Sequence, residues 1–405
     1  MNPDVRALFP GASEQPYFDI SANSLMAEPV RAAIERHLAG RTSGRGDKTA
    51  MVATVNRARS SFASLIGASS DEVAITKNVS DGLNLFGASL PWREGDNVVL
   101  CPALDHPNNI YLWYSLVRTH GIEVRPVAPE DGHIPVGAMA AAMDERTRLV
   151  TIPSITFAPG FVTDMKAIAA EARRVGALTL VDAAQSVGAH HTDVGDLGVD
   201  ALAVAAQKAL LSVYGFGFLY VRREVAETLT PVHVARFGIE LDAHETAYSD
   251  DELRFRAGAL RFDVGNYNYL GAAATDAALD LLSAWGVERV EMHVCGMAAD
   301  LANGLLDLGL PVVGGRPGPR LAHIVSVGES GGGRHYTADD PAMNSLYDHL
   351  SAAGIRLAIR TGMLRFSIAV YNDETDINRV VEAAREWCAM TGYLPTPDKA
   401  PGTLG

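Results

Sequence analysis

Short apolar runs alternate with amphipathic segments along the first two thirds of the chain. The runs are continuous and five to nine residues long, a pattern typical of strands that are buried on both faces. They cover residues 72–76, 97–102, 122–127, 148–156, 178–182, 201–206 and 216–221. Helical spacing separates several of them, most clearly at 51–68, 80–90 and 165–177, and Ser80 and Asp81 are candidate caps of the second segment. This order favours βαβ units and a mostly parallel sheet.

The pattern becomes more helical after residue 266. Long helical segments are predicted at 271–286, 287–309 and 377–392, with short strands at 323–327 and 365–370. A glycine-rich stretch at 327–342 is expected to form a mobile loop. We therefore predict an N-terminal arm at 1–20, a large α/β domain at 21–265, a smaller α+β domain at 266–395 and a tail at 396–405.

Composition limits the classes of protein to consider. Of 405 residues, 48% are hydrophobic and 20% are charged, which suits a globular protein and excludes disorder, collagen and coiled coil. The net charge of −14 opposes binding to nucleic acid phosphates. Neither a secretory leader nor a membrane span is evident, so we expect a cytoplasmic protein.

The sequence gives little indication of a metal site or of disulfide bonds. The cysteines Cys101, Cys295 and Cys388 lie far apart and form no CxxC pair, and the twelve histidines are scattered. We therefore predict neither a disulfide framework nor a metal site, and we expect the thiols to be reduced.

An acid and a lysine follow two of the predicted strands. Asp182 ends the run LTLVD, and Lys208 comes shortly after the next run. Carboxyl ends of strands in an open parallel sheet are where ligands bind. A desolvated lysine is a nucleophile toward aldehydes, and a buried acid needs a cationic partner. Pyridoxal phosphate would explain both, although a helix cap or salt bridge for Asp182 and a surface role for Lys208 remain alternatives.

The segment VDAAQSVGAHHTDVGDLGVDALAVAAQKALLSVYGFGFLYV at 181–221 resembles the central part of the class V aminotransferase family. This fold-type I pyridoxal phosphate group includes cysteine desulfurases, selenocysteine lyases and isopenicillin N epimerase-like enzymes. The resemblance extends from YFDISANSL near Tyr17 to YNDETDINRVVEA near the end of the chain. It implies a three-layer α/β fold with a mostly parallel sheet, pyridoxal 5′-phosphate as the cofactor, and a homodimer with shared active sites.

The resemblance also implies roles for individual residues around the cofactor ring. Lys208 would form the Schiff base, Asp182 would pair with the pyridinium nitrogen, and Gln185 would approach the phenolic oxygen. In LDHPNNIYLW, the family's ring-stacking position falls on His106, for which a purely structural role is the alternative.

Further positions would hold the cofactor phosphate and the substrate. The phosphate turn ITKNVSDGLNL carries Val79 and Ser80, and Ser80 is alternatively a plain cap. Gln207 is a further cofactor contact, and Asn266 in RFDVGNYNYLG would reach the phosphate in the partner subunit. In IRTGMLRFSIAVYN, Arg365 would clamp the substrate carboxylate with support from Arg360, unless Arg365 forms a surface salt bridge.

Four departures from the desulfurase pattern concern the reaction. No loop with a persulfide-forming cysteine stands before Arg365. Ala205 and Gln207 replace a Ser and a His that donate to the phosphate, Phe157 replaces an Asn beside the ring, and Pro107 replaces a second His.

The missing cysteine loop argues against persulfide transfer, and most of the nearest motif likenesses are to lyases. We predict an enzyme that acts on an amino acid through an external aldimine and Cα deprotonation, with Cβ elimination as the outcome. An aminotransferase is the first alternative and an amino-acid epimerase is the second. A retired fold that acts only as a binding protein is the alternative outside catalysis.

Overall fold

The computed structural model describes residues 3–241 and 253–393, so the predicted tail at 396–405 lies outside the described residues. A seven-stranded sheet has the order β1-β7-β6-β5-β4-β2-β3, and β7 alone runs antiparallel to its neighbours. Its strands are β1 (Val73–Thr76), β2 (Asn97–Leu100), β3 (Glu123–Pro126), β4 (Thr147–Pro153), β5 (Leu178–Asp182), β6 (Ala201–Ala205) and β7 (Gly217–Val221). The predicted α/β class with a mostly parallel sheet is confirmed.

Helices cover both faces of this sheet. They are α3 (Glu28–Thr42), α4 (Lys48–Leu65), α5 (Val79–Ser89), α6 (Tyr111–His120), α7 (Val136–Ala141), α8 (Met165–Arg174), α9 (Val194–Leu197), α10 (Arg223–Ala226) and α11 (Tyr269–Trp285). Successive residues of β6 point to opposite faces, so Leu202 joins a core with α4, α8 and α11, whereas Ala203 joins a second core with α5 and α6. Two cores around one sheet make the large unit three-layered.

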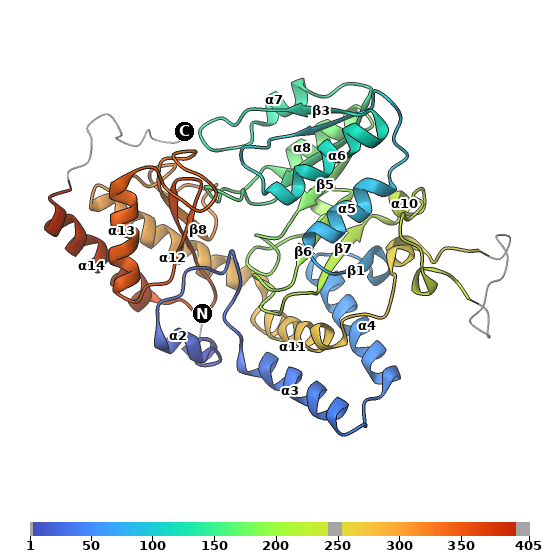
Figure 1. Cartoon of the computed structure of the whole chain (residues 1–405), viewed down its shortest axis with the longest axis horizontal. Helices are drawn as coiled ribbons and strands as arrows, with labels where there is room; N and C mark the ends of the chain where they lie inside the picture. The colour runs from blue at the N-terminus through green and yellow to red at the C-terminus, as the bar shows by residue number, and fades with distance from the viewer. Residues whose placement is uncertain (1–2, 242–252, 394–405) are drawn as a thin grey trace.

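A smaller antiparallel sheet has the order β8-β10-β9. It consists of β8 (Ile324–Gly328), β9 (Ala358–Arg360) and β10 (Met363–Ser367), and is accompanied by α12 (Val287–Asp307), α13 (Pro341–Ala352) and α14 (Glu374–Thr391). Figure 1 shows these elements in orange and red beside the large unit, with the N-terminal segment next to them.

The N-terminal segment is attached to this smaller unit. It contains α1 (Pro3–Ala7) and α2 (Pro10–Glu14), and Arg6 contacts Asp376 at 2.7 Å. Bridges from Tyr17 and Asp19 to the segment around β9 and β10 continue the attachment. Asp19 therefore lies at the junction between the two units, close to the edge of the smaller sheet.

The N-terminus of α5 differs in detail from the sequence prediction. Asn78 caps this helix, because its side chain accepts a hydrogen bond from the backbone N–H of Asp81. Asp81 instead accepts from the backbone N–H of Lys77 at 2.8 Å. The prediction that Ser80 or Asp81 is the cap was therefore wrong, since the helix begins at Val79 and both residues lie within its first turn.

No helix in the described part of the chain is both long and apolar enough to pass through a bilayer. The cytoplasmic location stays a prediction.

Candidate active site

A cavity of about 360 Å³ lies where the large unit meets the smaller sheet. Nine of the ten residues predicted from the sequence line it: Val79, Ser80, His106, Asp182, Gln185, Gln207, Lys208, Arg360 and Arg365. Asn266 is exposed and lies outside this cavity. Its predicted role is toward a partner subunit and stays a prediction.

Lys208 and Asp182 form the deep part of the cavity. Asp182 is the last residue of β5, and its carboxylate accepts a hydrogen bond from the backbone N–H of Ala184 at 3.0 Å. Burial raises the pKa of Asp182, and the nearby Lys208 ammonium counteracts this. Burial lowers the pKa of Lys208 to about 8, although Asp182 works against this shift. At neutral pH Lys208 is then the free amine in roughly one molecule in ten, a far larger fraction than for a lysine with an ordinary pKa.

A second acid, Asp105, lies beside this pair and was missed by the sequence analysis. Its carboxylate accepts from the backbone N–H of His106 and from the side-chain amide of Asn109, both at 2.7 Å. Burial and then the charge of Asp182 hold its pKa well above the ordinary value. The two acids and the lysine thus form one buried cluster of titratable groups, and a carboxylate in such a cluster can pair with the protonated nitrogen of a heterocycle.

One wall of the cavity consists of rings. The His106 ring meets Phe157 edge-on at 4.9 Å between centroids, and Phe157 stacks on His335 at 5.1 Å. Burial, with Lys208 as the next cause, lowers the pKa of His106 to about 4, so its ring is neutral at pH 7. A neutral ring in this position suits stacking on an aromatic cofactor better than a charged one.

The N-terminus of α5 provides the polar end of the cavity. Asn78 and Ser80 line it, and the side-chain amide of Asn108 donates to the Ser80 hydroxyl at 2.7 Å. Helix α5 is eleven residues long, and free backbone N–H groups at such an N-terminus favour a phosphate.

Arginines provide the opposite end. Arg365 is 1% exposed and donates to the backbone carbonyl of Phe157 at 3.0 Å, while the nearest acid, Asp19, lies 3.9 Å away. Burial and then the charge of Arg360 lower the pKa of Arg365 to about 9. Its Nε is buried and, within residues 3–241 and 253–393, has no hydrogen-bond partner. A buried guanidinium that has N–H donors without hydrogen-bond partners is well suited to bind a carboxylate.

Other unmet polar groups lie at the same junction. The amide of Gln185 donates to the backbone carbonyl of Ser21 at 3.2 Å, but its Oε1 has no partner among the described residues. The hydroxyl of Ser21 is also buried and unpaired within the described chain. These orphaned atoms fit a polar ligand, because a buried polar atom without a partner costs about 1–3 kcal/mol.

The glycine-rich loop supplies two further residues that the sequence analysis missed. His335 and Tyr336 line the cavity, and the Arg360 guanidinium lies 4.8 Å from the centre of the Tyr336 ring. The loop is joined to the β9–β10 turn through Thr361, whose carbonyl accepts from Gly331 and whose N–H donates to His335. An aromatic pair, HY, in an otherwise small and polar stretch was the only signal.

Comparisons with known proteins agree with this geometry. The family model described as Aminotransferase class-V matches residues 16–380. A probable cysteine desulfurase of Methanothermobacter thermautotrophicus is 34% identical over 74% of this chain and 74% of its own. An uncharacterized aminotransferase, YcbU, of Bacillus subtilis is 35% identical over 77% of this chain and 81% of its own.

A solved structure shares the fold over almost the whole chain. The apo cysteine desulfurase of Thermococcus onnurineus superposes with a TM-score of 0.82 at 25% identity, covering 97% of this chain and 99% of the other. The chain therefore belongs to the class V aminotransferase family and is a pyridoxal phosphate-dependent enzyme of lyase or aminotransferase type.

Proposed function

We propose that this enzyme catalyses β-elimination from a β-substituted amino acid and that it does not use a persulfide-forming cysteine. The observation that carries the proposal is the short turn between β9 and β10. Only Thr361 and Gly362 separate Arg360 from Met363, so no cysteine-bearing loop stands before Arg365. The three cysteines lie outside the residues that line the active-site cavity.

The residues of the cavity suit the cofactor. Lys208 would hold its aldehyde carbon, Asp182 its ring nitrogen, His106 its ring face, and Val79, Ser80 and Gln207 its phosphate end. Gln185 would lie at the phenolic oxygen. When bound, pyridoxal phosphate supplies an electron sink that stabilises negative charge at the substrate Cα.

The protein residues divide the remaining work. Arg365, supported by Arg360, binds the substrate carboxylate and fixes the orientation of Cα. Once released by the substrate, the Lys208 amine removes the Cα proton, a task that suits its pKa of about 8. His335 and Tyr336 line the same cavity and would contact the side chain of the substrate. The bond between Cβ and the leaving group then breaks. A thiolate takes up the proton that Lys208 removed from Cα, whereas chloride leaves as the anion, and water hydrolyses the remaining enamine to a 2-oxo acid and ammonia.

The test is incubation of the holoenzyme with β-chloro-L-alanine and with L-cysteine. Elimination predicts pyruvate and ammonia in equal amounts without any added 2-oxo acid. A Cys295→Ser/Cys388→Ser double variant should behave like the parent enzyme, whereas Lys208→Ala should be inactive. Strict dependence on a 2-oxo acid acceptor would contradict elimination and would support the second candidate, an aminotransferase, which the likeness to the Bacillus subtilis protein favours.

We also propose a homodimer in which Asn266 contacts the partner's cofactor phosphate. The segment before Asn266 is firmly anchored, because Asp263 is fully buried and pairs with Arg59 at 2.6 Å. Asp263 also accepts from the Tyr267 hydroxyl at 2.8 Å, so the exposed Asn266 stands between two fixed points. Sedimentation should show a dimer. Asn266→Ala should weaken cofactor retention and leave the dimer intact. A monomer with full cofactor affinity would contradict this proposal.

A further inference from the structure

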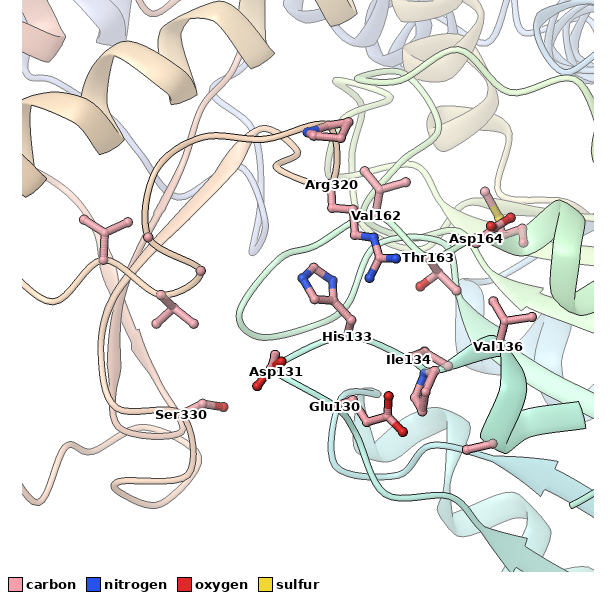
Figure 2. Close-up of a pocket in the computed structure, with 18 of the residues that line it drawn as sticks. Glu130, Asp131, His133, Ile134, Val136, Val162, Thr163, Asp164, Arg320 and Ser330 are labelled. Atoms are coloured by element: carbon pink, nitrogen blue, oxygen red, sulfur yellow. The ribbon is translucent and has the colours of Figure 1, made fainter. Parts of the chain in front are cut away.

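A second and larger cavity, of about 1300 Å³, shares no lining residue with the active-site cavity. Figure 2 shows it between the two units of the molecule. The large unit contributes the segments 130–138 and 162–166, and the smaller unit contributes residues from 306–320 and 328–330. We call it the seam cavity.

A tight hairpin brings His133 to this cavity. Glu130 and His133 exchange two backbone hydrogen bonds, of 3.0 and 2.8 Å, around the turn residues Asp131 and Gly132. Both turn residues have positive φ, 49° and 77°, as a two-residue hairpin turn of type I′ requires. The His133 ring stacks on Phe161 at 4.4 Å between centroids. Its position is therefore fixed by backbone and ring contacts rather than by its nitrogens.

Two buried polar side chains in this cavity lack partners. His133 is 6% exposed and Thr163 is 4% exposed. Neither ring nitrogen of His133 nor the hydroxyl of Thr163 has a hydrogen-bond partner in the part of the chain that the structure describes. Unmet polar atoms of this kind are costly, so their presence beside a cavity points to a ligand that satisfies them.

Arg320 approaches the same corner from the smaller unit. Its backbone carbonyl accepts from Val162 at 2.9 Å, which fixes the start of its side chain. Figure 2 shows its guanidinium directed toward the space that His133 and Thr163 also face. Across residues 3–241 and 253–393, no carboxylate forms an ion pair with it. Burial, and then the charge of Arg320, lower the pKa of His133, so the corner offers one cation and a neutral ring.

The hairpin that carries His133 also brings acidic side chains to the lining. Glu130 and Asp131 both line the cavity, and neither forms an ion pair with any described residue. A simple anion would meet Arg320 but would be repelled by these carboxylates, and a simple cation would leave Arg320 without a partner. A molecule that carries both charges satisfies both sides.

We propose that the seam cavity binds a free, zwitterionic amino acid at a site separate from the catalytic one. Its carboxylate pairs with Arg320 and accepts hydrogen bonds from Thr163 and His133. Its ammonium group lies toward Asp131 and Glu130. Because the residues come from both units, the bound amino acid bridges them.

The test uses N,N-dimethylglycine, a zwitterion whose tertiary amine cannot form a Schiff base at the catalytic site. Isovalerate has the same shape and carboxylate but lacks the positive charge. Calorimetric titration of the holoenzyme should show one N,N-dimethylglycine site per chain and binding of isovalerate weaker by at least about tenfold, as the loss of one charge-assisted contact implies. Equal binding of the two probes, or no binding of N,N-dimethylglycine, would overturn the proposal.

Variants assign the binding to the cavity. Arg320→Gln should weaken N,N-dimethylglycine binding by at least about tenfold, whereas Arg316→Gln should not, since Arg316 lies nearby on the surface and pairs with Asp307. Asp131→Asn removes one charge and keeps a residue that tolerates positive φ, so it should weaken the zwitterion and not isovalerate. Thr163→Val gives a second check if Arg320→Gln unfolds at a lower temperature. Unchanged binding in folded Arg320→Gln or Thr163→Val would overturn the proposal.

Discussion

The deep part of the active-site cavity and its arginine end differ in how their charges are balanced. The deep end holds Asp182, Asp105 and Lys208, where acids and amine compensate each other and the carboxylates accept hydrogen bonds from the protein. The other end holds Arg365 and Arg360, and the nearest acid to Arg365 is 3.9 Å away.

This difference in charge balance suits two separate functions, tuning of the reactive amine and binding of the substrate carboxylate. A deep end whose charges are already compensated can hold a reactive group and tune its proton affinity, as Lys208 requires. An end whose buried cation has its nearest acid at 3.9 Å, and whose Nε has no partner among the described residues, instead gains stability when an anion arrives, as substrate binding requires. The two ends can therefore be disturbed separately, and each should respond in a different kinetic parameter.

The largest effect is expected when the deep end loses its acid. Asp182→Asn keeps the shape of the side chain but removes the charge that would face the ring nitrogen. We expect turnover to fall roughly 10²- to 10³-fold, the range for loss of one group that stabilises developing charge, with a smaller change in KM. Steady-state kinetics of the reconstituted variant measure both, and unchanged turnover would remove Asp182 from the proposed mechanism.

A smaller effect on a different parameter is expected at the arginine end. Arg365→Lys keeps the charge but loses the fork that binds a carboxylate bidentately. We expect KM to rise about 10- to 100-fold, as the loss of 1.4 to 2.8 kcal/mol of substrate binding implies, with less change in turnover. Arg356→Lys, at an exposed position near β9, is the matched control and should leave both parameters unchanged. A fall in turnover alone in Arg365→Lys would contradict a binding role.

The pH dependence of cofactor uptake should report the pKa of Lys208, which burial lowers, Asp182 raises, and Arg365 and Arg360 lower further. The neutral amine is the nucleophile, so the rate at which apoenzyme takes up added pyridoxal phosphate should rise with pH and level off above about 8. Because the charge of Asp182 raises the pKa of Lys208, Asp182→Asn should move this inflection to lower pH. Rapid-mixing absorbance measures both curves. A rate that keeps rising toward pH 10 would show an ordinary lysine.

Site residues that follow strands could be predicted from the sequence, whereas those whose position depends on loops could not. Asp182 was found because it ends an apolar run, and Lys208 because it comes shortly after the next one. The resemblance supplied Arg365 and His106. His335 could not be found, since hydrogen bonds from its loop to Thr361 place it in the cavity.

Helix α3 was not predicted from the sequence, for a different reason. Only Val30 and Ala33 are buried along its fifteen residues, so it carries too little apolar periodicity to be recognised. Packing against α11 is a tertiary effect that local sequence does not record. Asp105 lies in the segment after β2 and was not predicted, because its raised pKa depends on its closeness to Asp182 at the end of β5.

The most direct test of the central claim is to find which lysine carries the cofactor. Borohydride reduction of the holoenzyme fixes the pyridoxyl group, and peptide mapping by mass spectrometry then locates it. We expect the pyridoxyl group on Lys208 of the parent enzyme and no pyridoxyl group in Lys208→Ala. Lys48→Ala, a substitution at an exposed position, should be modified at Lys208 like the parent enzyme. A pyridoxyl group on any other lysine of the parent enzyme would contradict it.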